Sequence, residues 1–309
     1  MRLFVFFTAL VLANTVHALS PSKNARALRE KIIVNGNILK AAAREEFRLP
    51  VSRGFHQHDT SLCWVYSFLN AQETLYRVSH PGSTLELSRA AFQYRTMEDR
   101  MLRHARRSAD TPNMVKESGT PVDAWALGRS HGLIAFADYR DILTSWMVPT
   151  YQVVAIAVAR AETPQEQEVL LIAELERLFG ALPSATHLGG RTLSPLELCQ
   201  EVMGDQEWVS YAPGTQEALG PHADSDARPG AQSFYTSAAN IKRHIYESLK
   251  AGKPVNYTAN GHVVLIYGGA YDANGRPLRF YIKDSYEPFL YNAEAGKLLR
   301  ELVEITVLK

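Results

Sequence analysis

The sequence has few of the features that would assign it to a special class. Its 309 residues include only two cysteines, and 33 basic against 32 acidic side chains leave a formal net charge of +1. Such a balance gives no reason to expect nucleic acid or an anionic membrane as a partner. No run beyond the N-terminus reaches the roughly 18 apolar residues that a membrane-spanning helix needs. The 15 prolines and 19 glycines are too few for a disordered chain, which leaves an ordinary globular protein.

The first 18 residues are typical of a secretory signal peptide. Arg2 precedes an apolar run from Leu3 to Ala13, and Val16-His17-Ala18 fits a cleavage site after Ala18. The run is too short to span a bilayer. We therefore expect a soluble protein that is secreted or periplasmic, in a compartment where disulfides can form.

Residues 19–46 are basic and rich in alanine, with a helical pattern from Ile38 to Phe47. A segment of this length is too short to fold alone. We expect it to be an N-terminal arm or a short pro-segment in front of one larger domain, residues 47–309.

Two kinds of periodicity divide residues 47–309. Helical patterns dominate from about 55 to 210, and strand-like patterns dominate from about 235 to 309. Proline, glycine and acidic residues crowd 211–230, which we expect to be a surface loop. A run of helices followed by an antiparallel sheet predicts an α+β protein with two lobes.

The boundaries of most elements follow from caps and turns. The expected helices cover 89–107, 121–131 with Asp123 in the first turn and Gly132 at the end, 142–179 with a break at Pro164, a segment opened by Ser194-Pro195, and 238–251. The expected strands cover 255–259, 262–271, 279–286 and 302–308, with a hairpin turn at 272–275.

The stretch from Gln57 to Tyr76 places one cysteine, Cys63, at the start of a helix. Apolar residues recur behind it at the spacing of an amphipathic helix, at Trp64, Phe68, Ala71 and Leu75. Thr60 or Ser61 is the expected N-cap. The partial positive charge of a helix N-terminus favours the thiolate, which is the nucleophilic form of cysteine.

Two other interpretations of Cys63 remain open. It could be a structural thiol that packs at the start of a buried helix, or it could form a disulfide with Cys199, which would remove the nucleophile. Cys199 lies in an expected helix interior, where a packed thiol is the simplest expectation.

Two polar residues stand at the ends of neighbouring expected strands. His262 opens an otherwise apolar strand, and Asp284 lies near the end of its hairpin partner. The hairpin brings these two ends together, so the carboxylate could hold the imidazole. With Cys63 they supply the parts of a cysteine nucleophile system, and Gln57 could offer its amide to the oxyanion that nucleophilic attack creates.

In this order the residues resemble the papain superfamily of cysteine peptidases, and most closely its bleomycin hydrolase (aminopeptidase C) branch. Cys63-Trp64-Val65-Tyr66-Ser67-Phe68-Leu69-Asn70 is similar to that branch's Cys-Trp-Leu-Phe-Ser-x-Leu-Asn. Further motifs follow in the family's order: Glu86-Leu87-Ser88, Ser118-Gly119-Thr120, Ser194-Pro195-Leu196-Glu197 and Lys250-Ala251-Gly252-Lys253-Pro254-Val255. The resemblance covers roughly residues 47–308.

The resemblance implies a helical left lobe, an antiparallel β-barrel-like right lobe and an active-site cleft between them. It implies that Cys63 is the nucleophile, His262 the general base and acid, Asp284 the residue that orients the histidine, and Gln57 the oxyanion donor. Trp64 matches a structural tryptophan. The implied reaction is hydrolysis of a peptide or protein substrate through a thioester acyl-enzyme.

Two other functions stay open on the same residues. The fold could serve an acyltransferase or a deamidase that acts on a protein, or it could be a catalytically inactive binding protein.

The sequence departs from the family at several positions. Asp284 replaces the usual asparagine, Tyr286 replaces a tryptophan, and the glycine-rich segment that usually follows is missing. Thr60 stands where papain has a disulfide cysteine. The bleomycin hydrolase branch is cytosolic, and its C-terminal tail has no counterpart beyond Leu308, so we expect internal or mixed rather than strictly N-terminal cleavage.

Two further patterns carry no function. His56 and His58 could bind a metal, but no clear third ligand accompanies them, and we expect neither a metal nor another cofactor. Asn256-Tyr257-Thr258 fits a glycosylation sequon, yet it lies in an expected core strand.

Overall fold

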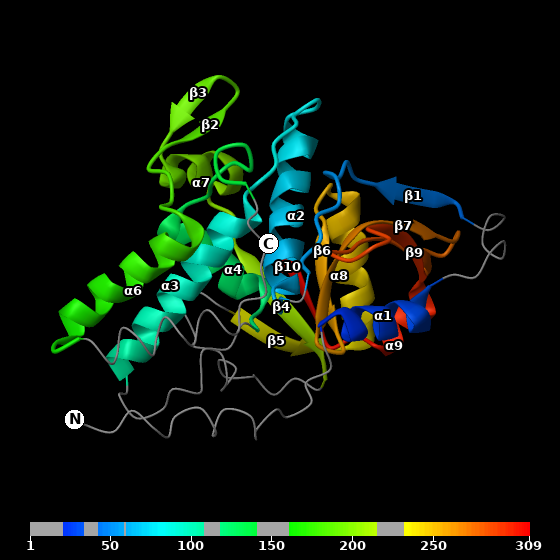
Figure 1. Ribbon diagram of the computed structural model, residues 1–309. Helices are drawn as coiled ribbons and strands as arrows, with labels where there is room; N and C mark the ends of the chain where they lie inside the picture. The colour runs from blue at the N-terminus through cyan, green and yellow to red at the C-terminus, as the bar shows by residue number, and fades with distance from the viewer. Residues whose placement is uncertain (1–20, 34–42, 59, 108–117, 141–160, 215–231) are drawn as a thin grey trace.

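The computed structural model describes residues 21–33, 43–58, 60–107, 118–140, 161–214 and 232–309. The expected signal peptide, the first part of the helix expected at 142–179 and most of the loop expected at 211–230 lie outside these residues. Figure 1 shows α2 between a group of helices (α3, α6 and α7) and the sheet, whose other side is covered by α8.

The helices and strands have the following bounds. The helices are α1 (Pro21–Ile32), α2 (Cys63–Ser79), α3 (Arg89–Arg107), α4 (Pro121–His131), α6 (Pro164–Phe179), α7 (Pro195–Met203), α8 (Ala238–Lys250) and α9 (Ala295–Arg300). The strands are β1 (Glu45–Arg48), β2 (Thr186–Leu188), β3 (Arg191–Leu193), β4 (Trp208–Pro213), β5 (Gln232–Thr236), β6 (Val255–Ala259), β7 (His262–Tyr271), β8 (Pro277–Lys283), β9 (Leu290–Glu294) and β10 (Glu304–Leu308).

The helix starts that carry local capping signals are confirmed. Thr120 caps α4 in a capping box with Asp123, and Gly132 ends that helix. Ser194 caps α7 in a second capping box with Glu197. Because a capping box provides hydrogen-bond partners for backbone N–H groups within one helical turn, it can be recognised from a few adjacent residues.

The main sheet has eight strands in the order β5-β4-β10-β6-β7-β8-β9, with β1 paired to β7. All neighbours in this sheet are antiparallel except β4 and β5, which are parallel. Among the described strands the path stays open, so the barrel-like closure that the resemblance implied is not seen.

The central strand β7 is buried along its whole length. Its side chains alternate between two cores: Val263 and Leu265 pack with the helical lobe, and Val264 and Ile266 pack with residues of α1, α8 and α9. A strand that is covered on both faces has a nearly continuous apolar sequence, and the sequence of β7 is of this kind. The same strand therefore joins the two lobes.

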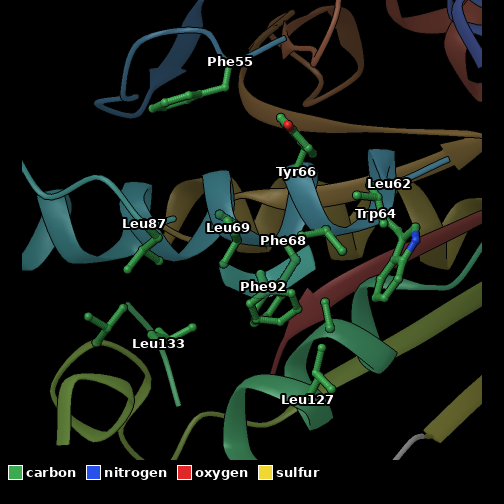
Figure 2. Close-up of a cluster of buried hydrophobic side chains, with 14 of the residues drawn as sticks. Phe55, Leu62, Trp64, Tyr66, Phe68, Leu69, Leu87, Phe92, Leu127 and Leu133 are labelled. Carbon is green, nitrogen blue, oxygen red and sulfur yellow. The ribbon is translucent and has the colours of Figure 1, made fainter. Parts of the chain in front are cut away.

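The helical core is built around α2. Phe68 packs against Phe92 of α3 and Trp208 of β4, with ring centroids 6.2 and 6.1 Å apart, and Figure 2 shows Phe68 and Phe92 among the apolar side chains of this core. Gly119 is required beside Trp64, because a Cβ at that glycine would lie 2.9 Å from the indole ring. Trp64 is thus a packing residue, as expected.

Two predictions at element boundaries are wrong. The helical pattern that ends at Phe47 does not hold over Glu45–Arg48, which form β1 and pair with β7 directly beyond the point where β6 stops. Residues 211–213, expected to open a surface loop, instead belong to β4, in which residues 208–211 pair with β10. In both places pairing with a distant strand overrides the local pattern.

The N-terminal helix α1 is packed onto the β-rich lobe. Leu28 and Ile32 are fully buried in the second core, and Lys31 forms an ion pair with Glu301 at 2.9 Å. Residues of the expected arm therefore contribute to the core of the domain. Among the described residues no helix is long and apolar enough to cross a bilayer.

Candidate active site

Cys63 is the first residue of α2, as predicted, but the predicted cap is wrong. The N-cap position is Leu62, and no side chain caps the helix. The hydroxyl of Thr60 instead donates to the carbonyl oxygen of Gln57 at 2.6 Å, which closes the tight turn before the helix. The helix that carries Cys63 therefore begins without a capping side chain.

The pairing of β7 with β8 brings His262 to Asp284. His262 is the first residue of β7, and Asp284 directly follows the last residue of β8. The Nε2 atom of His262 donates to Oδ1 of Asp284 at 2.8 Å, and both side chains are almost completely buried. The contact expected from the two strand ends is therefore present.

The carboxylate of Asp284 is held by more groups than the sequence indicated. Its Oδ1 also accepts the backbone N–H groups of Ser285 at 2.7 Å and Tyr286 at 3.2 Å, and its Oδ2 accepts the hydroxyl of Tyr291 at 3.2 Å. These bonds turn the chain away from the sheet, so β8 ends at Lys283 and not at the predicted residue 286. A carboxylate with this many donors keeps a fixed orientation.

The protonation of His262 is set by its buried surroundings. Burial by itself would lower the pKa of the ring, but the nearby Asp284 carboxylate, its hydrogen bond to the ring and the neighbouring Cys63 thiol raise the pKa of His262 to about 10. The Asp284 carboxylate therefore favours the protonated form of the ring. Because Nε2 is bound to Asp284, Nδ1 is the ring nitrogen left for Cys63.

Gln57 lies in the same site, although its contacts differ from a simple oxyanion donor. The side chain is fully buried, its Nε2 donates to the carbonyl oxygen of Thr60 at 2.5 Å, and its Oε1 accepts the hydroxyl of Ser285. An amide nitrogen carries two hydrogens, and the bond to Thr60 uses one of them. The role of Gln57 as oxyanion donor stays a prediction.

The ring of Tyr286 lies beside the imidazole of His262. Its ring centroid lies 5.8 Å from that of His262, and its hydroxyl donates to the carbonyl oxygen of His58 at 2.6 Å. The ring of His56 stands edge-on to Tyr286 at 5.1 Å. Tyr286 thus ties the loop before Cys63 to the segment after Asp284.

Ser285 and Tyr291 were missed by the sequence analysis. Ser285 stands in the Asp-Ser-Tyr motif, and its position beside the histidine-orienting residue could have indicated it. Tyr291 lies in β9, which no sequence pattern predicted, so no local signal pointed to it.

The second cysteine is not part of the site. Both cysteines are free, so the disulfide that the sequence left open is not formed. Cys199 is buried in α7, where its thiol contacts the sulfur of Met203 at 3.5 Å, and burial raises the pKa of Cys199 to about 11. The prediction of a packed, unreactive Cys199 agrees with this environment.

The histidine pair and the sequon have ordinary structural contacts. The backbone N–H of His58 donates to Nδ1 of His56 at 2.9 Å, within the loop. No group of three or more possible metal ligands occurs in the described part of the chain. Asn256 is fully buried in β6, and the hydroxyl of Ser67 on α2 donates to its side-chain oxygen at 2.7 Å.

Comparisons with known proteins were made by sequence and by structure. No family model matches the chain, and no curated protein matches it in sequence. Among solved structures, PepW from Lactobacillus rhamnosis is similar, with a TM-score of 0.62, 12% identity, and 93% of this chain and 84% of that chain covered. Digestive procathepsin L 3 of Tenebrio molitor aligns with a TM-score of 0.42 and 10% identity, over 91% of this chain and 78% of that one. The likeness shows the fold, which is the two-lobed fold of papain-like proteins.

Proposed function

We propose that the chain is a cysteine peptidase of the papain-like type, in which Cys63 attacks the peptide carbonyl. One observation carries the proposal: a buried imidazole, His262, is bonded to a carboxylate on one side and reaches a helix-start thiol on the other. The three side chains thus form a row of nucleophile, base and orienting group, as in known cysteine nucleophile systems.

The chemistry follows from the protonation of the pair. The thiolate of Cys63 forms a bond to the carbonyl carbon of the substrate, and the carbonyl electron pair moves to its oxygen. When this oxyanion collapses, the C–N bond breaks and the imidazolium of His262 gives its proton to the departing amine. Water then attacks the thioester while neutral His262 takes its proton, and the C–S bond breaks, which releases the acid and restores the thiolate–imidazolium pair.

The oxyanion requires donors on the α2 side of the site. The backbone N–H of Cys63 is one, because the first N–H groups of a helix have no partner within it. The second hydrogen of Gln57 Nε2 is the other. Ser285 and Thr60 hold that amide in place from both ends.

The proposal extends to the branch of the papain superfamily and to the export of the protein. The motif from Cys63 to Asn70 supports the bleomycin hydrolase branch, and the apolar N-terminus supports export with cleavage after Ala18. N-terminal sequencing of the protein made in a secreting host tests the second point: a mature chain that begins at Leu19 supports it, and an intact N-terminus contradicts it.

The function is tested by incubating the protein and its Cys63→Ala variant with a peptide library and identifying products by mass spectrometry. We expect hydrolysed peptides from the wild type alone. Release of ammonia, or products in which an amine has joined the peptide, would instead indicate deamidation or acyl transfer by the same acyl-enzyme. No product with the wild type would favour a binding protein.

A further inference from the structure

A buried charged cluster lies between α2 and the sheet, next to the candidate site. Its charged members are Glu73 on α2, Arg89 at the start of α3 and Lys283 at the end of β8, and all three side chains are fully buried. Lys283 directly precedes Asp284 in the chain. The cluster is therefore attached both to the strand that carries the orienting carboxylate and to the helix that begins with the nucleophile.

A continuous chain of hydrogen bonds crosses the cluster. Nζ of Lys283 donates to the carbonyl oxygen of Ser52 at 3.0 Å and also to the Ser52 hydroxyl. That hydroxyl donates to Oε2 of Glu73. Ser52, in the extended segment after β1, thus links the end of β8 to α2.

The far end of this chain is fixed firmly to α2 and α3. The Arg89 guanidinium binds both carboxylate oxygens of Glu73, and the backbone N–H of Leu87 donates to Glu73 Oε1 at 2.7 Å. Arg89 also donates to the side-chain oxygen of Asn70 on α2 at 2.8 Å. These bonds fix the orientation of the Glu73 carboxylate, so that its Oε2 can accept the hydroxyl of Ser52.

The net charge of the cluster depends on whether Lys283 is protonated. Glu73 and Arg89 already form a neutral pair, so the protonated form of Lys283 adds a positive charge to the cluster. Burial lowers the pKa of Lys283 to about 7, with attraction from Glu73 opposing this effect and the positive charges of Arg89 and Arg77 adding to it. An apolar side chain would fill the same place without the desolvation cost. What the lysine provides in return for this cost is its pair of hydrogen bonds to Ser52.

We propose that Lys283 is a positioning residue that fixes the Asp284–His262 pair relative to Cys63, by way of Ser52 and Glu73. The proposal rests on the proposed function. Cys63 and Asp284 belong to different layers of the fold, and the attack of the thiol depends on the geometry between those layers. A displacement of 1 Å caused by a remote change can cost about a hundredfold in rate.

The test compares Lys283→Met and Ser52→Ala with the wild type. Methionine keeps the unbranched stem of lysine and leaves Glu73 and Arg89 as a balanced pair, so the fold should persist. The control is Lys297→Met, which removes a half-exposed lysine paired with Glu294 at 3.0 Å on α9. For each protein, the rate of Cys63 alkylation by iodoacetamide at pH 6 is followed by peptide mass spectrometry. The kcat and KM are measured on a peptide that the wild type cleaves.

In Lys283→Met we expect both the alkylation rate and kcat to fall by about tenfold or more, with KM and the melting temperature nearly unchanged. Ser52→Ala keeps the lysine's bond to the backbone carbonyl and should show a smaller loss in the same direction. Lys297→Met should match the wild type. A purely structural role would lower the melting temperature and leave the kcat and alkylation rate of the folded protein unchanged.

Wild-type alkylation and kcat in folded Lys283→Met would overturn the proposal. If that variant does not fold, Ser52→Ala decides, and wild-type rates in it overturn the proposal equally. If the wild type cleaves no peptide, the alkylation rates decide alone, so failure of the proposed peptidase activity is not mistaken for failure of the positioning role.

Discussion

At His262, three influences act on a single proton. Burial opposes the imidazolium, and the Asp284 carboxylate and the Cys63 contact favour it, with the result that the pKa of His262 is raised to about 10. A raised histidine pKa keeps the ring protonated below that value, and the proton is lost as the pH rises through it. In the proposed mechanism the thiolate–imidazolium pair attacks, so activity should extend into the alkaline range.

Asp284→Asn should stay active, because an amide oxygen can also accept the proton of Nε2. Loss of the negative charge should move the alkaline limb of kcat/KM to lower pH by roughly one unit, the usual scale for a neighbouring charge. The acid limb should hardly move, because the thiolate lies on the far side of the ring. The measurement is kcat/KM from pH 4 to 11 for both proteins. An unshifted alkaline limb would show that Asp284 does not set the charge of His262.

Gln57→Ala should lower kcat by about a hundredfold, with KM nearly unchanged, because an oxyanion donor acts mainly in the transition state. Gln57→Glu is the matched control for shape: it keeps the side-chain length but replaces the donating amide with a carboxylate, and it should be at least as slow. Steady-state kinetics on one peptide measure both. A change confined to KM would place Gln57 in substrate binding instead.

The candidate site could be predicted where the chemistry lies in short motifs. Cys63 follows a polar loop at a helix start, and His262 and Asp284 mark two strand ends, so each has a local signal. Ser285 and Lys283 have partners at Gln57 and Ser52, which are 228 and 231 residues away in the chain. Such pairs form only when the sheet packs against the segments before α2, and a single sequence does not show which distant segments pack together.

Among the elements, those with a strong local pattern were predicted with the correct type and nearly correct bounds. Strand β7 has a continuous apolar run, and α4 has both a cap and a terminal glycine. Strand β1 has neither, since its Glu-Glu-Phe-Arg sequence is strand only because β7 offers a pairing edge beyond β6. The short strands β5 and β9 were missed for the same reason.

The buried pair of Glu73 and Arg89 should be needed for the docking of α2 against the start of α3. Glu73→Gln removes the buried carboxylate that balances the charge of Arg89, which should lower the free energy of unfolding by about 3–5 kcal/mol. Glu294→Gln, in a half-exposed pair with Lys297, should lower it by only about 0–1 kcal/mol. Urea unfolding of the two variants measures the difference. Equal effects would contradict a buried, mutually dependent pair.

For the whole molecule, the order of helices before strands was enough to predict two lobes of an α+β protein. The open path of the sheet over the described strands could not be predicted, because closure depends on which strands meet at its edges. The place of the N-terminal segment could not be predicted either. Helix α1 is amphipathic, but its apolar side chains show no partner until the β-rich lobe is seen.

Leu28→Ala should lower the free energy of unfolding by about 2–5 kcal/mol, because it opens a cavity in the core shared by α1 and the sheet. Glu30→Ala, on the exposed side of the same helix, should change it by less than about 0.5 kcal/mol. Denaturant unfolding of the mature chain measures both. Equal stabilities would mean that α1 contributes nothing to the folded domain, as expected of a removable pro-segment and not of an integral arm.

The central claim is that His262 activates Cys63, and the alkylation rate of that cysteine at pH 6 tests it most directly. Cys199 is an internal control for reagent access, because the two cysteines are similarly buried, with 7% and 4% of their surface exposed. Its own pKa is raised to about 11, so the His262→Ala variant is the control for activation by the histidine. An ordinary thiol is less than about 1% thiolate at this pH. We predict that iodoacetamide labels Cys63 roughly a hundredfold faster than Cys199, and that His262→Ala removes most of this advantage. Equal rates for the two cysteines, or a Cys63 rate unaffected by His262→Ala, would contradict the account.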